Sequence, residues 1–346
     1  MTPDTATELS TPHDLLAAVP FMVGYHPKDS LVVMGSKEKK ITMAMRVDYP
    51  ESADLISVAE IIAGHLQREE SSEAIVVGYL PHGMNEADPL APLRSIISNR
   101  GIHIVESIVV NKGRFRSNFC IDLACCPDGG SPVPEINQSR VAAEQVMAGN
   151  PLPFIDLDEM KRSIAALPVD HELMEKISTI KEIDYSKDDF VLLQREGADA
   201  INECAIEFAR SGLIREKSSV ALVLVRLLDL QVRDYAMGMT TEENADQLWD
   251  MWRWLLRIAP AGYVAPIAVI FATMSYERGE GALAQRALDR ALEDIPGYQM
   301  AKLLRRTFAA GWPPSAFTQM RADLHPKICA AIYAKKPLSE VVPSIP

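Results

Sequence analysis

The sequence lacks an apolar stretch long enough to cross a bilayer, which takes about 20 residues in a helix. Its most apolar run, residues 220–230, is interrupted by Arg226 and Asp229 and is typical of a buried helix. Residues 1–8 have neither the basic start nor the apolar core of a secretory signal, so we expect none. We therefore predict a protein without a membrane partner.

Cysteine is scarce too, with five in 346 residues. An odd number of cysteines in a long chain fits free thiols in a reducing cytosol better than a disulfide framework. This composition predicts a cytoplasmic protein.

Positive charge is in deficit. The chain has 35 Lys and Arg against 47 Asp and Glu, and its formal net charge is −12. An acidic protein repels phosphate backbones at long range, so nucleic-acid binding would need a local basic patch. The best candidate, formed by Lys112, Arg114 and Arg116, is short, and we interpret it as a solvated loop. We expect no nucleic-acid partner.

The sequence also lacks the signatures of common enzyme classes. Gly78 and Gly83 lack the partners that a glycine-rich phosphate loop needs, and no serine lies in a nucleophile elbow. No motif is therefore specific enough to name a reaction.

What is present is an ordinary globular balance of 48% hydrophobic and 24% charged residues. The first 150 residues mix two periodicities. Residues 41–48 alternate apolar and polar side chains, as in a half-buried strand, whereas residues 51–70 place apolar side chains at helical spacing. By the same reasoning we expect further strands at residues 31–34, 74–80, 102–110 and 115–121, and further helices that begin at residues 12, 89 and 139.

The order of these elements predicts an α/β domain. Short connections, including the turn Asn111-Lys112-Gly113, favour antiparallel hairpins at both ends of the sheet. Strand–helix–strand crossovers between them favour parallel pairing in the middle. We expect a mixed sheet with a parallel centre.

From residue 188 onward only helical periodicity is found. The expected helices are 189–211, 216–237, 242–258, 263–279, 281–294, 298–310, 314–324 and 326–334. The chain then divides into an α/β domain (1–150), a connecting region (151–187), an all-helical domain (188–335) and a tail (336–346).

One segment of the helical domain has the spacing of a tetratricopeptide unit. Small and apolar residues that suit close helix packing are followed by a proline that closes the unit. These residues are Ala284, Leu288, Ala291, Leu292 and Pro296. The spacing predicts a tetratricopeptide-like helical stack, a type of scaffold that binds protein partners.

Several stretches resemble a known family. They are residues 14–21, 24–33, 46–48, 113–114, 120, 125–127, 130, 132, 233–234, 279–296, 311 and 313. Together they resemble the actinobacterial family of domains of unknown function numbered 4192, over roughly residues 10–325. The resemblance implies an actinobacterial or actinophage setting and no assigned activity. Phe115 and Arg116 depart from the bulky aromatics common there, which puts a stacking role at that place in doubt.

The predicted topology suggests where a site would lie. Ligands of open α/β sheets bind beyond the carboxyl ends of parallel strands. The loop before the first strand starts at that same edge, so six side chains are expected to meet there: His26, Asp29, Ser30, Asp48, His82 and Lys112. The first five are candidate acid–base or nucleophilic groups, and Lys112 with Arg114 are candidate ligand-binding cations. The alternative is structural, with capped turns, an Arg46–Asp48 pair and solvated histidines.

The cysteines Cys120, Cys125 and Cys126 are weak candidates for zinc. Zinc sites prefer cysteine pairs spaced by two to four residues, and adjacent cysteines rarely hold one ion. We expect ordinary packing and no cofactor.

Our leading hypothesis from sequence is a non-enzymatic interaction or regulatory protein with a protein partner. The alternative is a hydrolase or nuclease-like enzyme acting at the rim of the sheet. A third hypothesis is a structural module stabilised by zinc.

Overall fold

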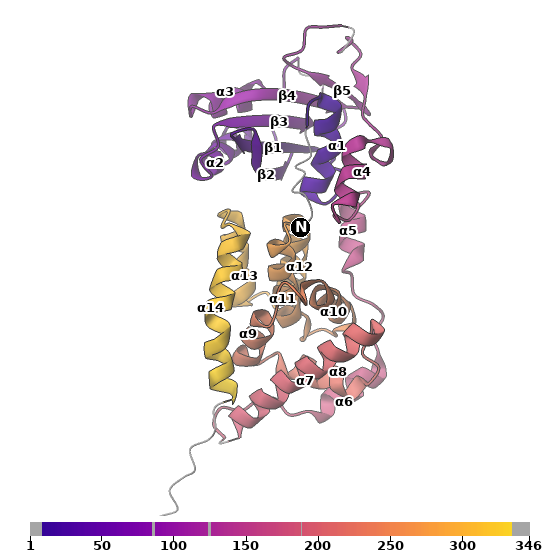
Figure 1. Ribbon diagram of the computed structural model, residues 1–346, viewed down its shortest axis with the longest axis vertical. Coiled ribbons are helices and arrows are strands. Elements are labelled where there is room, and N and C mark those ends of the chain that lie inside the picture. The colour runs from indigo at the N-terminus through magenta and orange to yellow at the C-terminus, as the bar shows by residue number, and fades with distance from the viewer. Residues whose placement is uncertain (1–8, 85–86, 124–125, 188, 334–346) are drawn as a thin grey trace, which may run out of the picture. The chain divides into compact units, whose positions relative to one another are not determined.

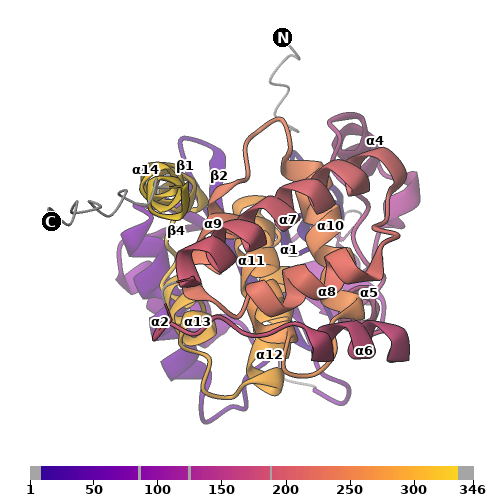
Figure 2. The ribbon, with the colours of Figure 1, turned by 90° about the horizontal axis from the view of Figure 1, so that it is seen from below.

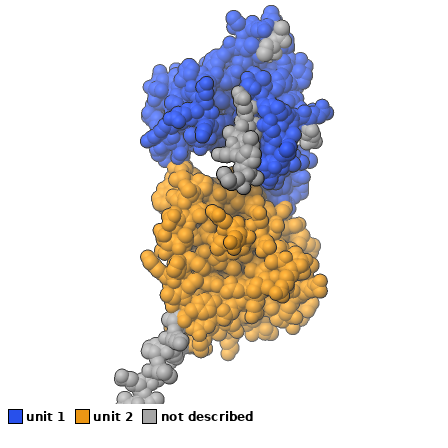
Figure 3. Space-filling view, viewed as in Figure 1, with its two compact units in different colours: residues 1–163 blue, residues 164–346 orange. Residues whose placement is uncertain are grey.

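The computed structural model describes residues 9–84, 87–123, 126–187 and 189–333. The chain divides into two compact units, residues 1–163 and 164–346, coloured separately in Figure 3. The first unit contains a sheet with helices, and the described part of the second contains helices and no strand (Figure 1). The predicted fold class is confirmed. No helix in the described part of the chain is long and apolar enough to cross a membrane.

The sheet of the first unit has the strand order β2-β1-β3-β4-β5-β6 among the described residues. Its centre is the parallel pair β3–β4, and the other neighbours are antiparallel, so the predicted mixed sheet with a parallel centre is confirmed. The strands are β1 (Ser30–Lys37), β2 (Lys40–Asp48), β3 (Glu73–Tyr79), β4 (His103–Asn111), β5 (Arg114–Ser117) and β6 (Ser131–Pro132).

Two tight turns close the hairpins of this sheet. Lys112 and Gly113 connect β4 to β5 with φ of 51° and 73°, and Glu38 and Lys39 connect β1 to β2 with φ of 52° and 63°. Two consecutive residues with positive φ make the turn whose twist matches that of the flanking strands. The turn predicted at Asn111-Lys112-Gly113 is confirmed.

Strand β5 is shorter than the predicted strand 115–121. It ends at Ser117, whose Oγ accepts hydrogen bonds from the backbone N–H groups of Phe119 and Cys120, both at 3.1 Å. These bonds turn the chain away from the sheet.

Helices cover both faces of this sheet. On one face Leu31, Val33 and Val76 join a core with α2 and α3. Because strand side chains alternate, Val32, Val77 and their neighbours face the other side, where α1 lies across the strands (Figure 1). The helices of this unit are α1 (Pro12–Val23), α2 (Leu55–Arg68), α3 (Ala91–Asn99), the short 3₁₀ helix η1 (Ile136–Gln138), α4 (Arg140–Met147) and α5 (Leu157–Ser163).

The second unit is built around α11. This helix is buried on all sides over residues 264–275, and Figure 2 shows it among the other helices of the unit. The helices are α6 (His171–Thr179), α7 (Phe190–Ser211), α8 (Lys217–Arg226), α9 (Leu230–Gly238), α10 (Ala245–Ile258), α11 (Val264–Glu277), α12 (Gly281–Asp294), α13 (Gln299–Ala309) and α14 (Pro314–Tyr333).

Two helix boundaries in this unit differ from the prediction. The expected helix 216–237 is two helices, because Asp229 caps α9 by accepting from the backbone N–H groups of Gln231 and Val232. The expected helices 314–324 and 326–334 are one helix, α14, with Pro326 in its interior. The repeat-like spacing falls on α12, where Ala284, Leu288 and Ala291 are buried. Its tetratricopeptide character stays a prediction.

Candidate functional site

A pocket of about 380 Å³ opens in the first unit, at the edge of the sheet where β3 and β4 end. Four segments line it: α1, the loop from α1 to β1, the ends of β3 and β4 with the residues that follow them, and the chain that leads into η1. The lining residues are Leu16, Pro20, His26, Pro27, Lys28, Asp29, Tyr79, Leu80, His82, Val110, Asn111, Lys112, Gly113, Val133, Pro134 and Ile136. An apolar lining with a few polar groups, at this volume, is typical of small-molecule sites.

The register of the strands explains why these segments meet. Tyr79 pairs with Ser30 of β1 and with Val110 of β4, so the start of β1 and the ends of β3 and β4 lie at one edge. Tyr79 and Val110 face the α1 side of the sheet, where Leu16 and Pro20 complete the apolar floor.

The end of α1 places the histidine of the site. Gly24 ends the helix with φ of 90°, a conformation that favours glycine, and its N–H donates to the carbonyl of Pro20 at 2.7 Å. The chain then pairs with Phe154. The backbone N–H of His26 donates to the Phe154 carbonyl at 3.1 Å, and the Phe154 N–H donates to the Gly24 carbonyl at 2.9 Å. These bonds hold His26 at the pocket.

Burial sets the protonation of two groups in the pocket. It lowers the pKa of His26, and the nearby charge of Lys28 lowers it further. His26 is therefore neutral at pH 7, with one donor and one acceptor nitrogen. Burial also raises the pKa of Tyr79, which keeps its hydroxyl protonated and able to donate.

Four of the six side chains expected at this rim line the pocket, namely His26, Asp29, His82 and Lys112. The other two, Asp48 and Ser30, lie at the same edge of the sheet but do not line the pocket. The Asp48 carboxylate is exposed and forms an ion pair with Arg46 at 2.5 Å. Ser30 is fully buried, and its Oγ has no hydrogen-bond partner among the described residues.

Arg114, the second cation expected to bind a ligand, has a different role. Its guanidinium donates to the carbonyl oxygens of Gly129 and Gly130 at 2.7 and 2.5 Å. It therefore holds the loop before β6. Sequence reasoning missed Lys28 and Tyr79 as lining groups. The position of Tyr79 at the end of a strand predicted to be buried could have revealed it.

The structure describes two of the three candidate zinc cysteines, Cys120 and Cys126. Cys126 is buried, the thiol of Cys120 lies 3.9 Å from the carbonyl oxygen of Asp122, and Cys125 lies outside the described residues. Among the residues that the structure describes, no group of three His, Cys, Asp or Glu side chains could hold a metal ion.

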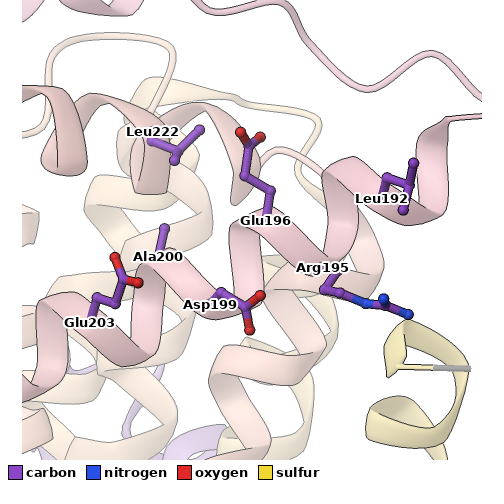
Figure 4. Close-up of a pocket in the computed structure, with 7 residues that line it drawn as sticks. All are labelled: Leu192, Arg195, Glu196, Asp199, Ala200, Glu203 and Leu222. Carbon is purple, nitrogen blue, oxygen red and sulfur yellow. The ribbon is translucent and has the colours of Figure 1, made fainter.

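A second pocket, of about 350 Å³, lies on α7 and α8 of the helical unit (Figure 4). Three of its four charged lining residues have partners within the unit, and Glu203 is the fourth. Arg195 donates to the carbonyl of Ile332 at 3.4 Å, Asp199 accepts from the hydroxyl of Tyr333 at 2.7 Å, and Glu196 pairs with Arg226. These contacts join α7 to α8 and α14, so we take the pocket at the sheet edge as the candidate site.

Comparison with known proteins gives a family and no activity. The family model described as a domain of unknown function, DUF4192, matches residues 12–315, and the chain belongs to this family. No curated protein and no solved structure matches the chain.

Proposed function

We propose that this member of a family of unknown function is a non-enzymatic interaction or regulatory protein. In this proposal the α/β unit binds a small molecule in the sheet-edge pocket, and the helical unit binds a protein partner. The observation that carries the proposal is the pocket itself, with its apolar floor and polar rim. It lies beyond the carboxyl ends of the parallel strands, where α/β sheets bind ligands.

The placement of the reactive side chains favours binding over catalysis. Acid–base or nucleophilic chemistry needs its groups within reach of one reacting atom. Here the Asp48 carboxylate is paired with Arg46, and the Ser30 hydroxyl is buried outside the pocket lining. The polar groups that remain in the pocket can orient a ligand.

A fragment screen tests the binding role. Val110 is nearly buried and lines the pocket, so Val110→Phe fills part of its volume, whereas Val105→Phe changes an exposed residue of the same strand. Fragments detected by ligand-observed NMR should bind the wild type and Val105→Phe equally and lose affinity for Val110→Phe. If no fragment distinguishes the two variants, the pocket is not a binding site.

The alternative, a hydrolase or nuclease-like enzyme, has one observation in its favour. His26, Asp29 and His82 line the same pocket, and such groups can transfer protons. The two functions differ in turnover. Ester and phosphodiester substrates should be hydrolysed at a rate that His26→Ala abolishes if the chain is an enzyme, and at background rate in both proteins if it is a binding module.

The partner-binding half of the proposal rests on exposed apolar side chains. Leu303 on α13 and Met320 and Leu324 on α14 are between 42% and 58% exposed. A partner captured from cell extract should bind the wild type and Lys327→Glu, and should not bind Leu324→Glu. Equal capture by both variants would remove α14 from the proposed surface.

The proposal includes no cofactor, no nucleic acid and no membrane partner, and it places the protein in the cytoplasm. The free thiols of Cys120, Cys126, Cys204 and Cys329 support a reducing compartment. Metal analysis of the purified protein tests the zinc alternative, because a structural site at the cysteines would give about one zinc per chain.

A further inference from the structure

We propose that the sheet-edge pocket takes an organic phosphate monoester, with the phosphate against Lys112 and Lys28 and the organic group on the apolar floor. This inference rests on the proposed binding function and adds the chemical class of the ligand.

Lys112 is a pocket-lining cation in the tight turn between β4 and β5. Its backbone has φ of 51° in the turn after β4, a conformation that is strained for a residue with a side chain. Lys39 has the same conformation in the other hairpin, so the strain alone indicates no function. What distinguishes Lys112 is that it lines the pocket, and that no carboxylate of the described residues pairs with its ammonium group.

The other polar groups around the pocket can also donate hydrogen bonds to an anion. Lys28 supplies a second charge from the opposite loop. The neutral His26 and the protonated Tyr79 each offer one donor, and no described residue accepts from the Tyr79 hydroxyl. Asp29 is the one carboxylate among the lining residues that the structure describes. The described lining, with Lys28 and Lys112 against Asp29, is therefore net positive in a chain whose formal net charge is −12.

The type of cation favours phosphate over carboxylate. A planar carboxylate matches the fork of an arginine, whereas lysine binds phosphate as a point charge. The nearby Arg114 guanidinium is occupied by the carbonyls of Gly129 and Gly130. Lys28 and Lys112 line the pocket from two separate loops, and the proposal assigns them to different oxygens of one tetrahedral group.

The floor of the pocket requires an organic group on that phosphate. Leu16, Pro20, Val110, Val133 and Ile136 present apolar surface that inorganic phosphate would leave uncovered. Burying this surface against a ring removes it from water, which favours binding. The pocket volume of about 380 Å³ suits a small ring-bearing molecule rather than a polymer.

Phenyl phosphate is the simplest probe that carries both parts. Calorimetric titration at low salt should give it an affinity at least about tenfold higher than phenol, which lacks the charge, or inorganic phosphate, which lacks the ring. Lys112→Asn should weaken phenyl phosphate about 5- to 10-fold, the loss expected for one charge-assisted hydrogen bond at a partly exposed site. Asparagine suits this turn position, so the variant keeps the hairpin.

Lys39→Asn is the matched control, because it removes the same charge from the same backbone conformation in the other hairpin. It should leave the affinity for phenyl phosphate unchanged. Equal losses in the two variants would mean that only the overall charge matters, which overturns the inference.

Different results would contradict the ligand class and the binding function. If phenol binds as tightly as phenyl phosphate and Val110→Phe weakens both, the pocket binds ligands but the phosphate assignment is wrong. If Val110→Phe changes the binding of neither probe, the proposed function fails together with the inference.

Discussion

Removing the guanidinium of Arg321 should destabilise the helical unit more than most single changes in it. Arg321 on α14 donates from Nε and Nη2 to the two carboxylate oxygens of Glu277 on α11, at 3.1 and 2.9 Å. Its Nη1 donates to the carbonyl of Thr240 at 2.6 Å. Both charged side chains are only 11% exposed. This pair fixes α14 against the central helix of the unit.

The magnitude follows from the burial. Arg321→Met leaves the Glu277 carboxylate buried without its partner, which costs about 3–5 kcal/mol. The double variant Arg321→Met with Glu277→Leu removes both charges and should recover most of that loss, because an apolar pair avoids the cost of desolvating two ions.

Tryptophan fluorescence measures this unit selectively. All four tryptophans of the chain, Trp249, Trp252, Trp254 and Trp312, belong to the helical unit. With a urea dependence of about 2 kcal/mol per molar, the unfolding midpoint of Arg321→Met should fall by roughly 2 M. A fall of less than about 0.5 M, or a double variant no more stable than the single one, would refute the reasoning.

Three further predictions concern the α/β unit. Gly78→Ala should destabilise the unit by about 1–3 kcal/mol, because the new Cβ would lie 2.7 Å from Cδ2 of the fully buried Leu90. Gly64→Ala on α2 meets nothing within 4 Å and should stabilise the unit by up to about 1 kcal/mol. Hydrogen exchange in β3 measures both variants, and equal effects would contradict the packing argument. Thr11→Ala should lower the free energy of unfolding by about 1 kcal/mol, because it removes the capping box at the start of α1, in which Thr11 and Asp14 accept each other's backbone N–H. Calorimetry that shows no loss of stability would disprove this role. NMR titration of His26 should give a pKa below its ordinary value of 6.5. Since the unfolded chain then takes up the proton first as the pH falls, the stability that neutral His26 contributes is complete above pH 6.5 and is lost as the pH falls toward its folded pKa. A measured pKa above 6.5 would reverse the sign of this pH dependence.

Local patterns were enough to predict much of the fold. The alternation of Met43, Met45 and Val47 places one face of β2 against the core, because a strand repeats every two residues. Thr11 and Asp14 mark the start of α1 because their side chains accept hydrogen bonds from each other's backbone N–H groups, a contact between residues three apart in the sequence. Predictions were wrong where a side chain redirected the backbone, as Ser117 does after β5 and Asp229 does between α8 and α9.

The candidate site could be predicted in part. Strand order placed His26, Asp29, His82 and Lys112 at one edge, since that edge follows from which strands are parallel. Whether a side chain enters the pocket depends on partners far away in the sequence. Arg114 was expected to bind a ligand, but its guanidinium holds the carbonyls of Gly129 and Gly130 instead.

The sequence by itself determined the division into an α/β part and a helical part, because periodicity and capping depend on residues within one or two turns of each other. Only the tertiary structure decided which polar groups share a pocket. Which polar groups meet depends on strand register and on the Tyr25–Phe154 bridge that positions His26. It also depends on whether a charged group pairs with a neighbour outside the pocket, as Asp48 does with Arg46. These contacts join residues distant in the chain, and their free energies are set by burial, which no local pattern contains.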